Sequence, residues 1–80
     1  MWPMKQPMLK PEDGATFHGG IEKSGGLFKA WCRAELEAGG RWSAESREWG
    51  YNLGSEQEAI AWIDRRCAER RFEGWTRDDW

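Results

Sequence analysis

Few side chains of this sequence could carry out bond-making chemistry. His18 is the single histidine, and the two cysteines are Cys32 and Cys67. One imidazole cannot hold a metal ion without several carboxylates, and the cysteines lack the CxxC or Cys/His spacing of a zinc site. Since no serine or cysteine has a companion base in its sequence context, we expect no enzyme, no catalytic residue, no metal and no cofactor. We interpret both cysteines as buried, reduced thiols, although the sequence leaves a disulfide between them open.

The paired glycines are the next residues with a chemical use, because glycine-rich loops cradle phosphate. Gly19-Gly20 and Gly25-Gly26 lack the GxxxxGK[ST] and GxGxxG spacings of such loops. We interpret them as hairpin glycines, since glycine tolerates the positive φ of tight turns.

Seven tryptophans in 80 residues point to contact surface. A domain of this size buries only about 60% of its unfolded surface, so some of these indoles are expected to be exposed. Tryptophan is enriched where one protein binds another. The expected anchors for a protein partner are Trp31, Trp49, Trp75 and Trp80.

Charged residues form two further candidate surfaces. An acidic group at one end of the expected sheet is suited to a basic partner, and it comprises Glu35, Glu37, Glu45 and Glu48. Four arginines near the end of the expected helix either balance the helix dipole or form a basic edge for phosphate or an acidic protein: Arg65, Arg66, Arg70 and Arg71.

Overall composition limits the class of protein. The chain has 12 basic and 14 acidic side chains and a net charge of −2, which argues against a general polyanion binder. It lacks an apolar run of about 18 residues and the hydrophobic region of a signal peptide, so we expect a cytoplasmic protein with no membrane partner. The oligomeric state is left open.

Three segments must position these residues. Residues 1–14 hold all three prolines and are expected to form an extended arm. Residues 15–73 are expected to form one domain. Residues 74–80 are expected to form a tail too short for another element.

Periodicity predicts three strands within the domain. Residues 15–22 form the first, and residues 27–37 alternate as a half-buried second strand with an exposed Trp31 on its outer face. Residues 41–53 return as one long or two short strands. Because Trp42 and Trp49 differ in parity, we expect a bulge or bend between residues 46 and 50.

A capping box at residues 55–58, Ser-Glu-Gln-Glu, predicts a helix that begins at Glu56 and ends near Arg71 or Phe72. The expected fold is α+β, with a three-stranded antiparallel sheet and one C-terminal helix packed on it in the order β-β-β-α. The expected core comprises Phe28, Cys32, Leu36, Leu53, Ile60, Ile63 and Cys67.

Residues 49–62, WGYNLGSEQEAIAW, resemble the end of the small sheet-plus-helix domains of the AP2 and integrase N-terminal type. In that family the sheet lies in the DNA major groove and uses arginine and tryptophan side chains. The resemblance implies a DNA-binding face that contains Arg33, Arg41 and Arg47 beside Trp31.

The size, layout and composition of the whole chain also resemble small phage-encoded inhibitors, including anti-CRISPR proteins of type I systems. This resemblance implies a non-enzymatic protein of the host-cell cytoplasm that binds a nuclease or surveillance complex where it would hold DNA. We therefore predict an inhibitor that blocks a nucleic-acid path with tryptophan anchors and acidic groups, and the DNA-binding module is the alternative. In this interpretation Trp31→Ala abolishes inhibition and leaves the thermal midpoint nearly unchanged.

Overall fold

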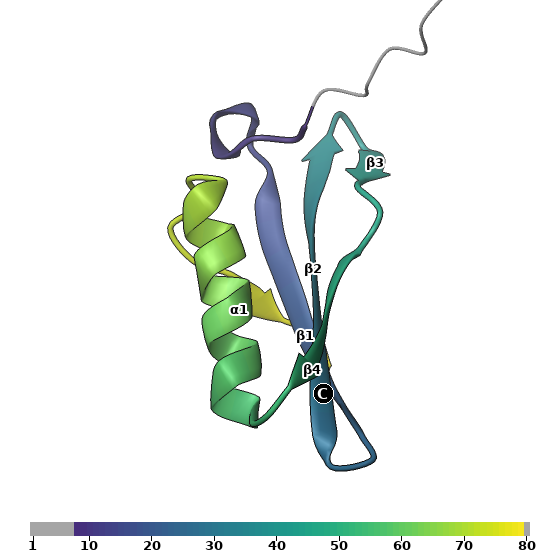
Figure 1. The fold of residues 1–80 in the computed structure, drawn as a ribbon. Helices are drawn as coiled ribbons and strands as arrows, with labels where there is room; N and C mark the ends of the chain where they lie inside the picture. The colour runs from purple at the N-terminus through teal and green to yellow at the C-terminus, as the bar shows by residue number, and fades with distance from the viewer. Residues whose placement is uncertain (1–7, 80) are drawn as a thin grey trace, which may run out of the picture.

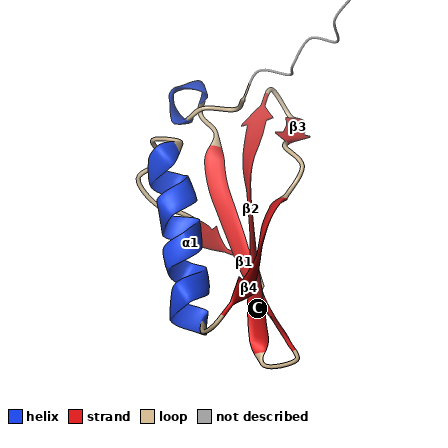
Figure 2. Ribbon diagram, viewed as in Figure 1, coloured by secondary structure: helices blue, strands red, loops and turns tan. Residues whose placement is uncertain are grey.

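The computed structural model describes residues 8–79 of the chain. A five-stranded sheet carries one α-helix across one face, so the molecule has two layers (Figures 1 and 2). Residues 1–7 of the expected arm and Trp80 lie outside the described residues. In chain order the elements are the 3-10 helix η1 (Pro11–Asp13), β1 (Thr16–Ser24), β2 (Leu27–Ala38), β3 (Arg41–Ala44), β4 (Glu48–Leu53), α1 (Glu56–Glu69) and β5 (Thr76–Arg77).

Strand β2 is the centre of the sheet. It pairs antiparallel with β1 along one edge, and along its other edge it pairs antiparallel with β3 and β4. β5 adds to the free edge of β1 in parallel. The α+β class is confirmed, but the expected three-stranded antiparallel sheet is wrong because the sheet is mixed and has five strands. The segment that returns along β2 forms two short strands, and one more strand follows the helix.

The tail therefore contributes an element, contrary to expectation. Thr76 pairs with His18, and the Asp78 amide donates a hydrogen bond to the Gly19 carbonyl oxygen at 2.8 Å. Beside it, the Trp75 indole N–H donates to an Asp64 carboxylate oxygen at 2.7 Å. A strand of two residues persists at this edge because the residues on both sides of it are anchored.

The register break between β3 and β4 lies close to its expected position. Three steps along β2 from Glu35 to Cys32 match four steps of the returning chain, from Ala44 to Glu48. The extra residue falls at residues 45–47, and it changes the parity of everything that follows.

This break places Trp42 and Trp49 on the same face of the sheet, since they pair with Glu37 and Trp31 of β2. A second irregularity follows at Asn52, which has a φ of 60°. It returns the next residue, Leu53, to the side of α1, where Leu53 packs against the core.

Helix α1 begins where the capping box predicts. The Ser55 hydroxyl accepts a hydrogen bond from the Glu58 amide at 3.1 Å, while the Glu58 carboxylate accepts from the Gly54 amide at 2.8 Å. The helix ends slightly earlier than expected. Arg71 adopts a φ of 64°, and the Phe72 amide then donates back to the Cys67 carbonyl oxygen at 3.0 Å, which closes the last turn.

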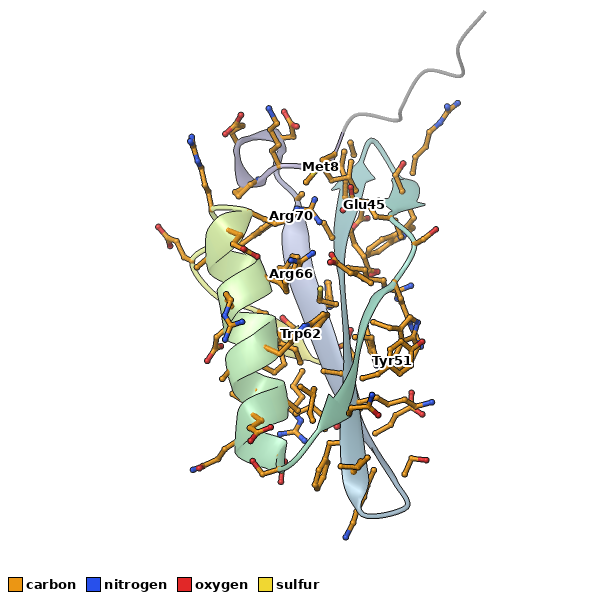
Figure 3. All side chains as sticks on the ribbon, viewed as in Figure 1. Met8, Glu45, Tyr51, Trp62, Arg66 and Arg70 are labelled. Carbon is orange, nitrogen blue, oxygen red and sulfur yellow. The ribbon has the colours of Figure 1, made fainter. Side chains whose placement is uncertain are left out.

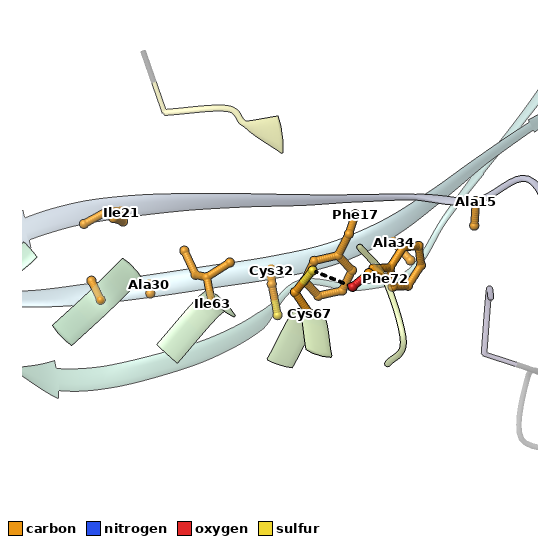
Figure 4. Close-up of a cluster of buried hydrophobic side chains, with 10 residues drawn as sticks. Ala15, Phe17, Ile21, Ala30, Cys32, Ala34, Ile63, Cys67 and Phe72 are labelled. Atoms are coloured by element: carbon orange, nitrogen blue, oxygen red, sulfur yellow. Dashed lines mark hydrogen bonds between the residues drawn. The ribbon is translucent and has the colours of Figure 1, made fainter. Parts of the chain in front are cut away.

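The hydrophobic core lies between α1 and the sheet (Figure 4). Ala59, Ile63 and Cys67 form the buried stripe of the helix, as their spacing predicts. Of the expected core residues, Cys32, Ile63 and Cys67 are buried, whereas Phe28, Leu36, Leu53 and Ile60 are partly buried at its margin. The remaining buried members come from both layers and from the chain after α1: Ala15, Phe17, Ile21, Ala30, Ala34, Ala59 and Phe72.

Glycines within the strands make room for indoles. A Cβ atom at Gly20 of β1 would lie 2.2 Å from the Trp31 indole nitrogen, and one at Gly50 of β4 would lie 2.5 Å from the Trp62 ring. Gly19 and Gly20 are thus not hairpin glycines, because both lie inside β1. Only Gly25 and Gly26, with φ of 58° and 85°, form the β1–β2 hairpin turn.

We predict that Gly20→Ala destabilises the protein by about 1–3 kcal/mol, because the added methyl group must displace a packed indole. Chemical denaturation followed by far-ultraviolet circular dichroism measures this change. The matched control is Gly74→Ala, since nothing lies within 4 Å of a Cβ at that position. Equal stability of Gly20→Ala and Gly74→Ala would contradict the interlocked packing.

Candidate functional site

The sheet face turned away from α1, which we call the outer face, is the candidate site. Ala30, Cys32 and Ala34 of β2 point into the core, so the alternate residues of β2 point outward. Strand pairing adds the residues opposite them. The outer face thereby gathers His18, Gly20, Glu22, Lys29, Trp31, Arg33, Glu35, Glu37, Trp42 and Trp49.

Trp31 occupies the middle of this face and is buried, with only 3% of its surface exposed. The expectation of an exposed Trp31 is wrong. Its ring lies against Gly20, and the guanidinium carbons of Arg47 and Arg33 lie 4.1 Å and 5.8 Å from the ring centroid. Two cations thus cover the indole, an arrangement in which the ring quadrupole attracts each charge.

The exposed aromatic surface lies beside Trp31 on β4. Trp49 is half-buried and stacks on Tyr51 at a centroid distance of 6.3 Å and an interplanar angle of 21°. Tyr51 is 62% exposed, and Figure 3 shows it pointing away from α1. The Lys29 ammonium lies 5.2 Å from the Trp49 ring centroid. We call Lys29, Arg47, Trp49 and Tyr51 the aromatic patch.

A further indole on the outer face belongs to Trp42, which is 69% exposed and pairs with the exposed Glu37. Sequence reasoning missed Trp42 and Tyr51 as candidates. The sequence feature that could have identified them is the change in alternation after Ala44. Once the register break is counted, Trp42 and Tyr51 fall on the same face of the sheet.

The expected acidic group is divided between the two faces. Glu45 pairs with Arg70 of helix α1 at 2.7 Å (Figure 3). Glu48 pairs with Arg66 of the same helix, so both carboxylates contact α1. Only Glu35 and Glu37 lie on the outer face, and Glu35 is already engaged by Arg33 at 3.6 Å. The four glutamates therefore do not form one acidic surface.

The same contacts account for the arginines at the end of the helix. Besides its ion pair with Glu45, Arg70 donates to the Leu9 carbonyl oxygen at 2.9 Å, while Glu45 accepts from the Leu9 amide at 3.2 Å. This network ties the segment before η1 to the domain. Arg66 and Arg70 thus join layers of the fold, which leaves Arg65 and Arg71 as the exposed arginines of this group.

Two other expected site residues lie apart from the aromatic patch. Trp75 packs against the core from the loop before β5. Arg41 pairs with Ala38, a position whose side chain faces opposite to Glu37, so Arg41 is separated from Arg33 and Arg47.

His18 is the centre of a polar cluster near the start of β1. Its Nδ1 lies 2.7 Å from Asp78 Oδ2, and its Nε2 lies 3.2 Å from Glu35 Oε2 and 2.9 Å from Thr16 Oγ1. These side chains come from β1, β2 and the residue after β5. The cluster was missed from the sequence because 60 residues separate His18 from Asp78.

Asp79, the residue after Asp78, helps to hold the tail in place through Arg77. Arg77 donates to Asp79 at 2.6 Å and to Glu56 at 2.8 Å. The hydrogen bond from Arg77 lowers the pKa of the Asp79 carboxyl below its ordinary value. The pKa of Arg77 is raised in return, chiefly by the hydrogen bond to Asp79.

The two cysteines are free and buried, as expected. Desolvation raises the pKa of both thiols, and for Cys67 the neighbouring Asp64 adds to this effect. The Cys67 thiol donates a weak hydrogen bond to the Phe72 carbonyl oxygen at 3.5 Å (Figure 4). Since the thiolate is the nucleophilic form, these properties suit packing rather than reaction.

Comparison of the chain with protein-family models, with curated proteins and with solved structures finds no match. The two resemblances drawn from the sequence stay predictions. Within residues 8–79, no helix is long and apolar enough to cross a membrane.

We predict that Trp31→Ala destabilises the protein by about 3–5 kcal/mol, because truncation of a buried aromatic side chain leaves a cavity. This replaces the expectation of an unchanged thermal midpoint. Tyr51→Ala is the matched control, since its side chain is exposed, and its effect is expected within about 0.5–1 kcal/mol. Urea denaturation of both variants tests the contrast, and a Trp31→Ala midpoint equal to that of the unsubstituted protein would contradict the burial.

We also predict that Asp79→Asn reduces the loss of stability in acid. A carboxyl whose folded-state pKa is lowered contributes stability above the ordinary aspartate pKa of about 3.9, and that contribution is lost as the pH falls through the folded-state pKa. Removing the carboxylate removes this term and makes the dependence shallower. Urea midpoints measured between about pH 7 and pH 3 test this, with Glu73→Gln as an exposed control, and parallel curves for Asp79→Asn and the unsubstituted protein would contradict it.

Proposed function

We propose that this chain is a non-enzymatic binding protein that docks a larger protein complex on its aromatic patch. The stacked pair of Trp49 and Tyr51 is the observation that carries the proposal, because it offers exposed aromatic area on a rigid sheet. Aromatic side chains on a rigid surface lose little conformational entropy on binding and are typical hot spots.

Mixed charge around the patch supports a protein partner. Lys29 pairs with Glu22 at 3.8 Å, and Arg33 pairs with Glu35 at 3.6 Å, so cations and carboxylates alternate across the outer face. Protein interfaces combine an aromatic centre with a polar rim of both signs. A surface for nucleic acid alone would be more uniformly basic.

The inhibitory role is part of the same proposal and rests on the resemblance to small anti-CRISPR inhibitors. In the form that fits this geometry, the protein occludes a nucleic-acid path by its bulk when the aromatic patch is engaged. Acidic groups contribute less to this blocking than expected, because Glu45 and Glu48 already pair with Arg70 and Arg66. Glu37 is the expected acid that stays exposed on the outer face.

A DNA-binding module is the second candidate, and one observation favours it. The outer face places Arg33, Arg47 and Lys29 next to aromatic rings, the combination with which sheets contact nucleic acid. The separation of Arg41 from Arg33 and Arg47 and the carboxylates of the outer face weigh against it.

We predict that the double substitution Trp49→Ala/Tyr51→Ala weakens partner binding by about 2 kcal/mol or more, roughly 30-fold in Kd, because it removes the aromatic centre of the interface. Affinity capture from host lysate with the tagged chain identifies the partner, and surface plasmon resonance on the purified pair measures the loss. Arg65→Ala on the exposed side of α1 is the control and should bind unchanged. Equal loss in both variants, or none in either, would refute the patch as the interface.

The DNA-binding alternative is separated by a salt titration on duplex DNA. A steep fall of log affinity with log salt that is lost in Arg33→Ala/Arg47→Ala would support it, because neutralised phosphates release counterions. Absence of binding at about 50 mM salt would remove it.

A further inference from the structure

We propose that His18, Glu35 and Asp78 form a site for a divalent transition metal ion, with zinc as the best fit. The three side chains come from β1, β2 and the residue after β5, and one potential ligand atom from each lies within 4.8 Å of the others. This inference is independent of the proposed function, because it concerns a different part of the outer face.

The contact between His18 and Asp78 determines how the imidazole presents itself. Asp78 Oδ2 lies 2.7 Å from Nδ1, a distance that favours the tautomer whose Nδ1–H donates to this carboxylate. The lone pair of Nε2 then accepts from the Thr16 hydroxyl at 2.9 Å, and a bound ion would take the place of that hydrogen bond. A carboxylate that orients the far nitrogen of a ligating histidine is the usual outer contact of zinc sites.

The second distance fits a shared ion. Zinc binds nitrogen and carboxylate oxygen at about 2.0–2.2 Å, and tetrahedral angles then place two ligand atoms about 3.4 Å apart. His18 Nε2 and Glu35 Oε2 are 3.2 Å apart, so both can contact one ion with little movement. With Asp78 on Nδ1, His18 and Glu35 supply two of the four tetrahedral positions, and waters would supply the other two. Thr16 Oγ1, at 2.9 Å from Nε2, is placed to hydrogen-bond one of these waters.

Burial and charge also fit. The side chains of His18 and Glu35 are only 18% and 15% exposed, so packing restricts the rotamers that each can adopt. Arg33 contacts Glu35 through Oε1 and leaves Oε2 for the ion. The carboxylates of Glu35 and Asp78 balance the two positive charges of a divalent ion, whereas the Arg33 cation reduces its affinity.

An imidazole in the ligand set selects among metals. Nitrogen ligands suit zinc and its transition-metal neighbours, while magnesium and calcium prefer oxygen ligands alone. A bound ion would join β1 and β2 directly and would hold β5 through Asp78. Binding to the folded state alone raises the thermal midpoint in proportion to the logarithm of the metal concentration.

The test uses the full chain freed of metal by EDTA and dialysis. Isothermal titration with zinc chloride should give one ion per chain, and the thermal midpoint should rise with zinc. His18→Ala and Glu35→Gln should abolish both effects, and Asp78→Asn should weaken binding by about 10- to 100-fold, as expected for an orienting partner. Glu37→Gln, another carboxylate of the outer face, is the control and should bind as the unsubstituted protein does.

A direct readout needs no substitution. Because His18 is the single histidine, its ring nitrogen resonances report the site, and zinc should shift Nε2 most strongly. Unchanged ring resonances at saturating zinc, or equal affinity in His18→Ala, would overturn the proposal. An intense near-ultraviolet thiolate band with cobalt would also overturn it, because it would assign the ion to Cys32 and Cys67.

Discussion

The packing of indoles on glycines is the constraint from which the arrangement of the molecule follows. Trp31 lies on Gly20 on the outer face, and Trp62 of the helix lies on Gly50 on the other. Each contact joins two elements closely, because a Cβ atom at Gly20 or Gly50 would overlap the facing indole. These two contacts fix how β1, β2, β4 and α1 stand relative to one another.

Ion pairs connect elements of the fold on the helix side of the sheet and link neighbouring strands on the outer face. Arg66 and Arg70 reach from α1 to Glu48 and Glu45, and Arg77 reaches from β5 to Glu56, so these charges connect elements of the fold. On the outer face, Lys29 and Arg33 pair with Glu22 and Glu35 of the same sheet and also lie over aromatic rings. A chain with nearly balanced charge thus keeps a surface suited to recognition while most of its acidic groups serve the fold.

Local signals in the sequence predicted local structure well. The capping box located the start of α1, alternation located β2, and the parity change located the break between β3 and β4. Properties that depend on contacts between residues far apart in the chain could not be predicted from the sequence. Trp31 appeared exposed because its strand partner Gly20 and its cover Arg47 were not known to face it, and β5 was missed because two residues carry no periodicity. Prediction of the cluster around His18 would have required both the pairing of β1 with β2 and the existence of β5.

The pairing of β5 with β1 also bears on the order of folding. His18 and Asp78 lie 60 residues apart, so their contact closes a loop that spans most of the chain, whereas the β1–β2 hairpin closes locally. During synthesis the hairpin can form as soon as it leaves the ribosome, but the edge of β1 stays unpaired until residues 76–78 emerge. Until then the nascent chain presents the unpaired N–H and C=O groups of β1 to its surroundings as an open strand edge.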